Sequence, residues 1–117
     1  MSASAGEELT CEDLKKVLAN GKVTIIDVRK PAELEKGKIE GSINIPVDNV
    51  KEAFSLNPGD FEGRFGFEKP ALMAPLIFHC QMGRRGANAT AIARQLGYTR
   101  AQNLKGGFGE WVQEEQQ

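Results

Sequence analysis

The feature that most constrains the fold of this chain is a short, nearly continuous apolar run, Pro75–Cys80. A strand with one solvated face alternates apolar and polar residues, whereas a strand buried on both faces does not. The run therefore predicts a central strand of a parallel sheet, covered by helices on both sides. Cys80 ends this strand, and the residues that follow, Gln81–Gly86, are polar and contain glycine.

Helical and extended patterns alternate along the rest of the chain. We expect a helix from Thr10 to Asn20, a strand at 23–26, a short helix from Pro31 to Gly37, a strand at 42–45, an irregular crossover at 47–74, a helix that follows Gly86 and ends at Gly97, a short strand at 101–104, and a closing helix around Phe108 and Trp111. This alternation predicts an α/β fold: one domain, with a central, mostly parallel sheet and helices on both faces. We assign residues 1–7 to a short polar tail and 8–115 to the domain.

Composition disfavours several classes of function. Fifteen Lys and Arg nearly balance sixteen Asp and Glu, so we expect neither nucleic acid nor a membrane surface as a partner. One histidine and two distant cysteines, Cys11 and Cys80, cannot supply a four-ligand zinc cluster, and we expect no metal or other cofactor. The acidic start of the chain lacks the pattern of a secretory signal, which favours a cytoplasmic protein with reduced thiols. The sequence shows no additional apolar helix or strand face that would need a partner, and we expect a monomer.

The segment that follows the central strand carries the chemistry that we expect. Sites in parallel sheets lie at the carboxyl ends of the strands, which is where Cys80 falls. Backbone N–H groups of the turn and the start of the next helix, together with Arg84 and Arg85, favour a thiolate there. Gly83 and Gly86 allow the backbone to turn tightly and to approach an anion. The loop is therefore predicted to hold negative charge around a nucleophilic sulfur.

The length of this loop separates two chemistries. Counted from His79 and Cys80, a cysteine phosphatase has its phosphate-binding arginine at the position that Gly86 occupies here, whereas Arg85 arrives one place early. A loop shortened in this way is too small for a tetrahedral phosphoryl group, but it can surround the outer sulfur of a persulfide. A phosphatase or an arsenate reductase is therefore the alternative that the residue count disfavours.

Four stretches together resemble the rhodanese domain family, and they occur in that family's order. They are 27–29 (Asp-Val-Arg), 37–46, the loop Cys80–Arg85, and 106–111. The resemblance covers residues 8 to 114. Within the family, the loop is similar to that of small single-domain members that act as thiosulfate:glutathione sulfurtransferases. Gln81 stands where many members have an arginine.

The resemblance implies a function and a role for each matching residue. Cys80 would attack the outer sulfur of thiosulfate, release sulfite and become a persulfide, which a thiol acceptor such as glutathione or thioredoxin would then discharge. Backbone amides of Gln81, Met82, Gly83, Arg84 and Arg85 would hold the persulfide, and the two arginines would attract the donor's sulfonate. Asp27 and Arg29 would lie behind the loop and support it.

Other interpretations stay open at this point. Some members of the family are regulatory modules or sulfur carriers rather than free-standing enzymes. His79 could serve as a base, but strand alternation turns its side chain away from Cys80, which favours a packing role. Cys11, near the start of a helix, could be mildly reactive, although a plain surface or half-buried thiol is the simpler interpretation.

Overall fold

The computed structural model describes residues 7–21 and 23–115. In chain order the elements are β1 (Glu8–Leu9), α1 (Cys11–Ala19), β2 (Thr24–Asp27), the 3-10 helix η2 (Pro31–Lys36), β3 (Ile43–Asn44), the 3-10 helix η3 (Val47–Asn49), α2 (Val50–Ala53), α3 (Pro58–Phe65), β4 (Leu76–His79), α4 (Arg84–Gln95), β5 (Ala101–Leu104) and α5 (Gly107–Glu115). Most of the tail that we assigned, residues 1–6, lies outside the described residues, and the boundary at residue 8 stays a prediction.

All neighbouring strands are parallel, in the order β1-β5-β4-β2-β3. The predicted α/β fold with a parallel sheet is thus confirmed, and the apolar run that ends at Cys80 forms the central strand β4. The register pairs Asp27 with His79, so β2 and β4 end side by side. The sequence analysis missed β1, because its two residues, Glu8 and Leu9, are too few to show a period.

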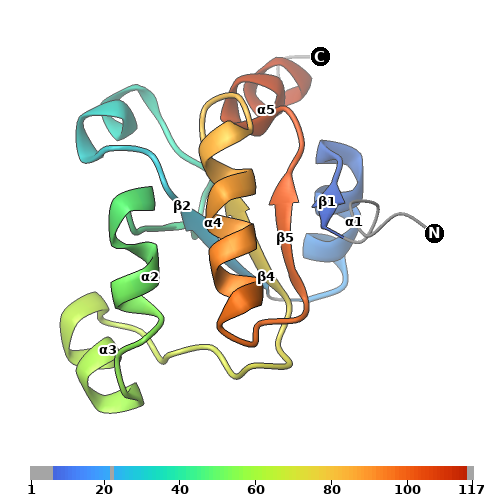
Figure 1. Cartoon of the computed structure of the whole chain (residues 1–117). Coiled ribbons are helices and arrows are strands. Elements are labelled where there is room, and N and C mark those ends of the chain that lie inside the picture. Colours follow the sequence, from blue (N-terminus) through green and yellow to red (C-terminus); the bar gives the residue numbers. More distant parts are fainter. Residues whose placement is uncertain (1–6, 22, 116–117) are drawn as a thin grey trace.

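Helices cover both faces of the sheet, with α4 crossing the front in Figure 1. Leu76, Phe78 and Cys80 point into the core beneath α2, α3 and α4, whereas Ile77 points into the second core beneath α1 and α5. Strand alternation therefore sends Cys80 to one face and the side chains of Asp27 and His79 to the other. This division decides which groups can reach the sulfur.

Two local predictions also hold. Thr10 caps α1 by accepting a hydrogen bond from the Asp13 amide at 3.0 Å, and the Asp13 carboxylate accepts one from the Thr10 amide at 3.2 Å. The long crossover is anchored rather than loose: Phe61 is fully buried, the Phe65 ring packs against it at a tilt, and the Phe67 ring packs against it edge-on.

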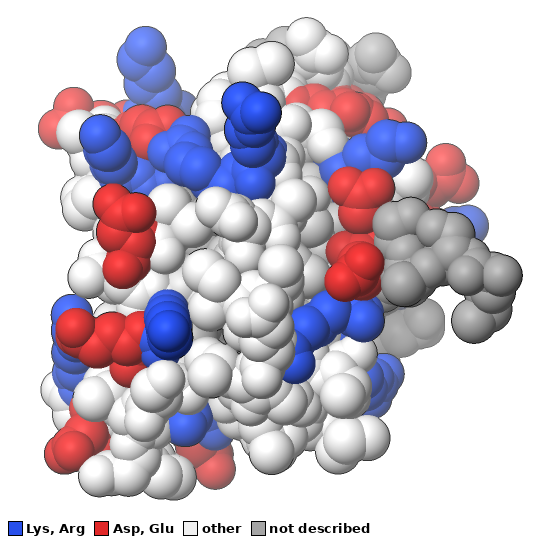
Figure 2. Space-filling model, in the orientation of Figure 1, with Lys and Arg blue, Asp and Glu red and all other residues white. Residues whose placement is uncertain are grey.

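The surface carries mixed charge. Figure 2 shows basic and acidic side chains interspersed over this face, with several basic ones gathered at its upper edge, near the start of α4. None of the helices formed by residues 7–21 and 23–115 has the length and apolar character needed to cross a bilayer.

Candidate active site

Cys80 sits in the turn between the end of β4 and the start of α4. Its Sγ accepts a hydrogen bond from the Gly83 amide at 3.0 Å, and Gly83 precedes the helix with a φ of 114°, a value that favours glycine. The next amides belong to the first turn of α4, where backbone N–H groups have no partner within the helix. Cys80 is only 1% exposed, so its sulfur lies inside the turn. The Gly83 amide is one donor of the predicted cradle, and the part of the other loop amides stays a prediction.

The start of α5 is hydrogen-bonded to the backbone of this turn. The Phe108 amide donates to the Cys80 carbonyl at 2.7 Å, and the Gly109 amide donates to the Gln81 carbonyl at 3.0 Å. Asn103 of β5 adds a hydrogen bond from its side-chain amide to the Gly83 carbonyl at 3.0 Å. Sequence reasoning matched the glycine-rich stretch at 106–111 only as a motif and did not assign it this supporting role, because the signal lies in spatial proximity.

Gly107→Ala is expected to disrupt the turn. A Cβ on Gly107 would lie 2.7 Å from the Gln81 carbonyl oxygen and closer still to that of Cys80, and its φ of +62° already favours glycine. We expect a loss of about 1–3 kcal/mol in unfolding free energy and a fall in turnover, measured by denaturant titration and steady-state kinetics. Gly63→Ala is the matched control, since that position in α3 has open space and should be neutral or stabilising. Full activity and unchanged stability in Gly107→Ala would contradict this packing argument.

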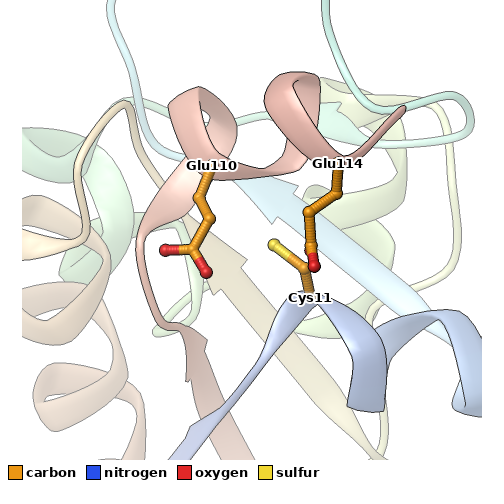
Figure 3. A group of neighbouring side chains, drawn as sticks. All are labelled: Cys11, Glu110 and Glu114. Carbon is orange, nitrogen blue, oxygen red and sulfur yellow. The ribbon is translucent and has the colours of Figure 1, made fainter. Parts of the chain in front are cut away.

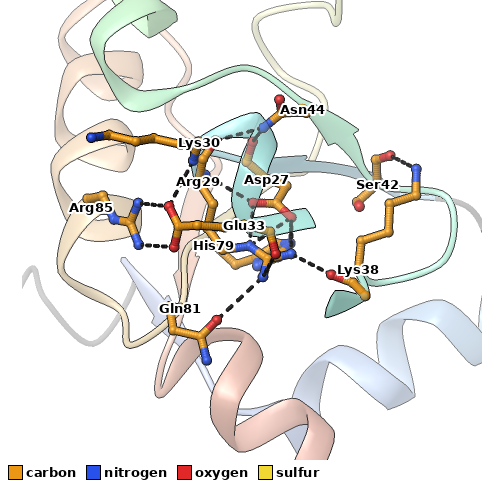
Figure 4. A network of polar contacts seen from close by, with 11 residues as sticks. Asp27, Arg29, Lys30, Glu33, Lys38, Ser42, Asn44, His79, Gln81 and Arg85 are labelled. Carbon is orange, nitrogen blue, oxygen red and sulfur yellow. Dashed lines mark hydrogen bonds and ion pairs between the residues drawn. The ribbon is translucent and has the colours of Figure 1, made fainter. Parts of the chain in front are cut away.

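Behind the loop lies a buried ion pair, Asp27 with Arg29, both essentially inaccessible to solvent. Arg29 Nη2 donates to Asp27 Oδ2 at 2.7 Å and Nε donates to Oδ1 at 3.0 Å (Figure 4). The same guanidinium lies over the Phe108 ring at 4.4 Å and contacts Gln81 Oε1 at 3.4 Å. Arg29 thereby joins the end of β2 to α5 and to the first loop residue.

The side chain of His79 is buried on the same face of the sheet as the Asp27–Arg29 ion pair. Its Nε2 lies 3.6 Å from Asp27 Oδ2, but burial lowers the pKa of His79 below its ordinary value. Neither ring nitrogen has a hydrogen-bond partner among the described residues. His79 therefore packs on the far side of the strand from Cys80, which confirms the packing interpretation over a role as a base.

The two loop arginines differ in their surroundings. Arg84 is exposed, and Met82, two residues before it in the turn, is 82% exposed. Arg85 instead forks onto Glu33 of η2, with Nη1–Oε1 at 2.6 Å and Nη2–Oε2 at 3.0 Å. This arginine, followed by the Lys30 amide, lowers the pKa of Glu33 to about 2. The sequence analysis missed Glu33, since no local pattern links it to a loop 52 residues away.

Cys11 lies apart from the site, at the start of α1, with its sulfur directed toward Glu110 and Glu114 of α5 (Figure 3). Ligand-type atoms of these three residues lie within 4.8 Å of one another. Burial, followed by the hydrogen bond to Glu114, raises the pKa of Cys11 to about 12. The expected surface or half-buried position of Cys11 is wrong, because its side chain packs into the core between α1 and α5, and its raised pKa disfavours the reactive thiolate.

We therefore expect iodoacetamide at about pH 8 to modify Cys80 alone in the native protein, because the thiolate is the reactive form and the raised pKa of Cys11 disfavours it there. Peptide mapping by mass spectrometry should show carbamidomethylated Cys80 first, and Cys11 only after unfolding. Unfolding exposes the Cys11 thiol and returns its pKa to the ordinary range. Comparable rates for both residues in the folded protein would contradict this assignment.

Comparisons with known proteins agree with the geometry. Residues 10–114 match the model of the rhodanese-like domain family. The chain is 42% identical over 104 residues to human thiosulfate:glutathione sulfurtransferase, covering 88% of this chain and 90% of that protein. It is 36% identical over 103 residues to the Saccharomyces cerevisiae protein of the same name, covering 86% and 74%. The solved structure of the human single-domain sulfurtransferase TSTD1 superposes with a TM-score of 0.88 at 40% identity, over 92% of this chain and 96% of that one.

Proposed function

Because the chain belongs to the rhodanese-like domain family, we propose that it is a thiosulfate sulfurtransferase that works through a persulfide on Cys80. The Cys80 thiolate attacks the outer sulfur of thiosulfate, a new S–S bond forms, and the old one breaks. Sulfite leaves with the electron pair of the broken bond. The enzyme then carries one extra sulfur, ready for transfer.

One observation carries this proposal: the sulfur of Cys80 lies at the N-terminal end of α4, 3.0 Å from the amide nitrogen of Gly83. An anionic terminal sulfur placed there would meet the unpaired amides of the first helical turn, from Arg84 onward, and the positive end of the helix dipole. We assign the amides of Gln81 and Met82 to the same persulfide-binding turn. Asp27 and Arg29 support it from behind, through the contact of Arg29 with Gln81.

The second half of the reaction needs a thiol acceptor, for which we propose glutathione. A thiolate attacks the outer sulfur of the persulfide, Cys80 leaves as thiolate, and the acceptor becomes a persulfide. A hollow of about 710 Å³ beside the loop, lined in part by Gln81, Glu33 and Lys36, has room for a small peptide thiol. Thioredoxin is the competing acceptor, and the exposed Met82 and Arg84 would be its first points of contact.

A cytoplasmic location and a monomeric state belong to the same proposal. Both cysteines are unbridged, which suits the reducing compartment in which glutathione is abundant. Large exposed apolar side chains in the described part of the chain are few. They are Val17 in α1, Leu72 and Met73 in the segment before β4, and Met82 in the turn after Cys80. This distribution does not form the broad apolar surface of an obligate dimer.

Intact-mass measurement tests the proposal. Thiosulfate should add the mass of one sulfur atom to the wild-type protein, and glutathione should remove it. Absence of any gain would refute thiosulfate as donor. A gain that glutathione leaves in place would favour a carrier that serves a protein partner.

A further inference from the structure

Arg85 lies in the first turn of the helix that follows Cys80 and pairs with a carboxylate. Its guanidinium forms the bidentate pair with Glu33, and the Cys80 side chain is near enough to contribute, after Glu33, to the raised pKa of Arg85. The side chains of Arg85 and Glu33 are 34% and 33% exposed, so the pair lies at the rim of the site, partly screened by solvent. A carboxylate is therefore built into the neighbourhood of the nucleophile.

Resting on the proposed function, we propose that Glu33 is a specificity-determining residue. It neutralises Arg85 and so weakens the preference of the site for doubly charged sulfur donors over singly charged ones. The donor class that this favours comprises singly charged thiosulfonates, which share the S–SO₂ group of thiosulfate but carry one charge less.

The carboxylate is held in place independently of any donor. Glu33 Oε1 also accepts the Lys30 amide at 2.9 Å, which caps η2. The same turn is fastened to the buried Arg29, which donates to the carbonyls of Glu33 and, at 2.9 Å, of Gly37. Figure 4 shows Glu33 between Arg85 and the backbone of Lys30. Moving the Glu33 carboxylate away from Arg85 would break these hydrogen bonds. An incoming sulfonate therefore encounters an ion pair with no net charge rather than an unpaired guanidinium.

Charge arithmetic gives the direction of the effect. Arg85 and Glu33 together contribute no net charge, which leaves the exposed Arg84 as the cation of the loop. Removing the Glu33 charge would leave Arg85 uncompensated. The attraction gained by a dianion would then be about twice that gained by a monoanion at the same position.

The test compares kcat/KM for thiosulfate with kcat/KM for methanethiosulfonate in wild type and Glu33→Gln. Glutamine keeps the size of the side chain and an oxygen for the Lys30 amide. We expect the ratio to rise about 3- to 10-fold, mainly through the KM for thiosulfate, and the gain to shrink at high salt. Glu35→Gln, which removes an exposed charge from the same 3-10 helix, is the control that should leave the ratio unchanged. Adding Arg85→Gln to Glu33→Gln should cancel the gain.

A second measurement does not depend on sulfur transfer. Iodoacetate and iodoacetamide both react with the thiolate, so the ratio of their rates at Cys80 reports the local potential and not the ionised fraction. This ratio should rise about 3- to 10-fold in Glu33→Gln and stay constant in Glu35→Gln.

An unchanged or lowered ratio in both assays would overturn the assignment, since a lowered ratio would mean that Glu33 positions Arg85 for the donor. If wild type fails to acquire sulfur while the alkylation ratio rises as expected, the proposed function fails and the electrostatic role of Glu33 stands. If wild type transfers sulfur and neither ratio rises, only the role of Glu33 fails.

Discussion

Cys80→Ser is expected to abolish sulfur transfer, lowering kcat/KM for thiosulfate by at least about 1,000-fold. A serine hydroxyl stays protonated at neutral pH, is a poor nucleophile toward sulfur, and cannot form a persulfide. The backbone of the turn should survive, because the Cys80 carbonyl still accepts from Phe108 and the buried side chain changes by one atom. The variant should therefore stay folded and inert.

Steady-state sulfite release and intact mass measure this prediction together. The wild-type protein should gain the mass of one sulfur atom with thiosulfate, and Cys80→Ser should gain none. Cys11→Ser is the matched control for loss of a buried thiol, and it should retain sulfur transfer. Residual turnover in Cys80→Ser near the wild-type rate would contradict a covalent role for this cysteine.

The phosphatase alternative is tested with the same variants. An aryl phosphate should be turned over by neither protein, because the turn between Cys80 and Arg85 is short and Arg85 is engaged by Glu33. Phosphate release by wild type that disappears in Cys80→Ser would reverse the assignment. Covalent capture of vanadate or tungstate by Cys80 in a soaked crystal would support the same reversal.

Arg29→Met is expected to cost about 3–5 kcal/mol of unfolding free energy, because it leaves the Asp27 carboxylate buried without its counter-ion. Methionine keeps much of the apolar contact with Phe108, so the loss reports the missing charge and its hydrogen bonds. The total stability of a domain this size is about 5–15 kcal/mol, and a change of this magnitude would remove a large share of it.

Denaturant titration of four proteins measures this effect: wild type, Arg29→Met, Asp27→Asn, and the double variant. Removing both charges should cost less than the sum of the single changes, since no buried ion is left unpaired. Glu52→Gln, which breaks the exposed pair with Arg64, is the control and should change stability by less than about 1 kcal/mol. A similarly small effect for Arg29→Met would contradict the expected stability contribution of the buried pair.

Much of the fold could be predicted because its strongest signals are local. The apolar run 75–80 indicated a strand buried on both faces, and β4 is central in the sheet with both faces covered. The capping residues of α1 also lie next to the helix they define. The predicted start of α4 was wrong: the helix begins at Arg84, directly after Gly83, so Gly86 lies inside the helix rather than before it. β1 escaped prediction because it consists of Glu8 and Leu9 alone and is specified by its pairing with β5.

The candidate site likewise has one part that local sequence predicts and another that depends on contacts between distant segments. Cys80 and the loop through Arg85 were placed by an architectural rule, because parallel strands and the helices that follow them put such a turn at one edge of the sheet. Local reasoning treated Arg84 and Arg85 alike, as two cations near an anion. The structure separates them, because the fold brings η2 against the turn and gives only Arg85 a carboxylate partner.

The amino-acid sequence alone therefore determined that Cys80, the proposed nucleophile, lies in a turn between a strand and a helix, because strand burial, turn formation and helix initiation depend on residues within a few positions of Cys80. Only the tertiary structure decided which charges act on that sulfur. A guanidinium pairs with whichever carboxylate the fold brings within hydrogen-bonding distance, and Glu33 lies on a different connection of the sheet from Arg85. Electrostatic partnership depends on distance in space, which the order of residues along the chain does not specify.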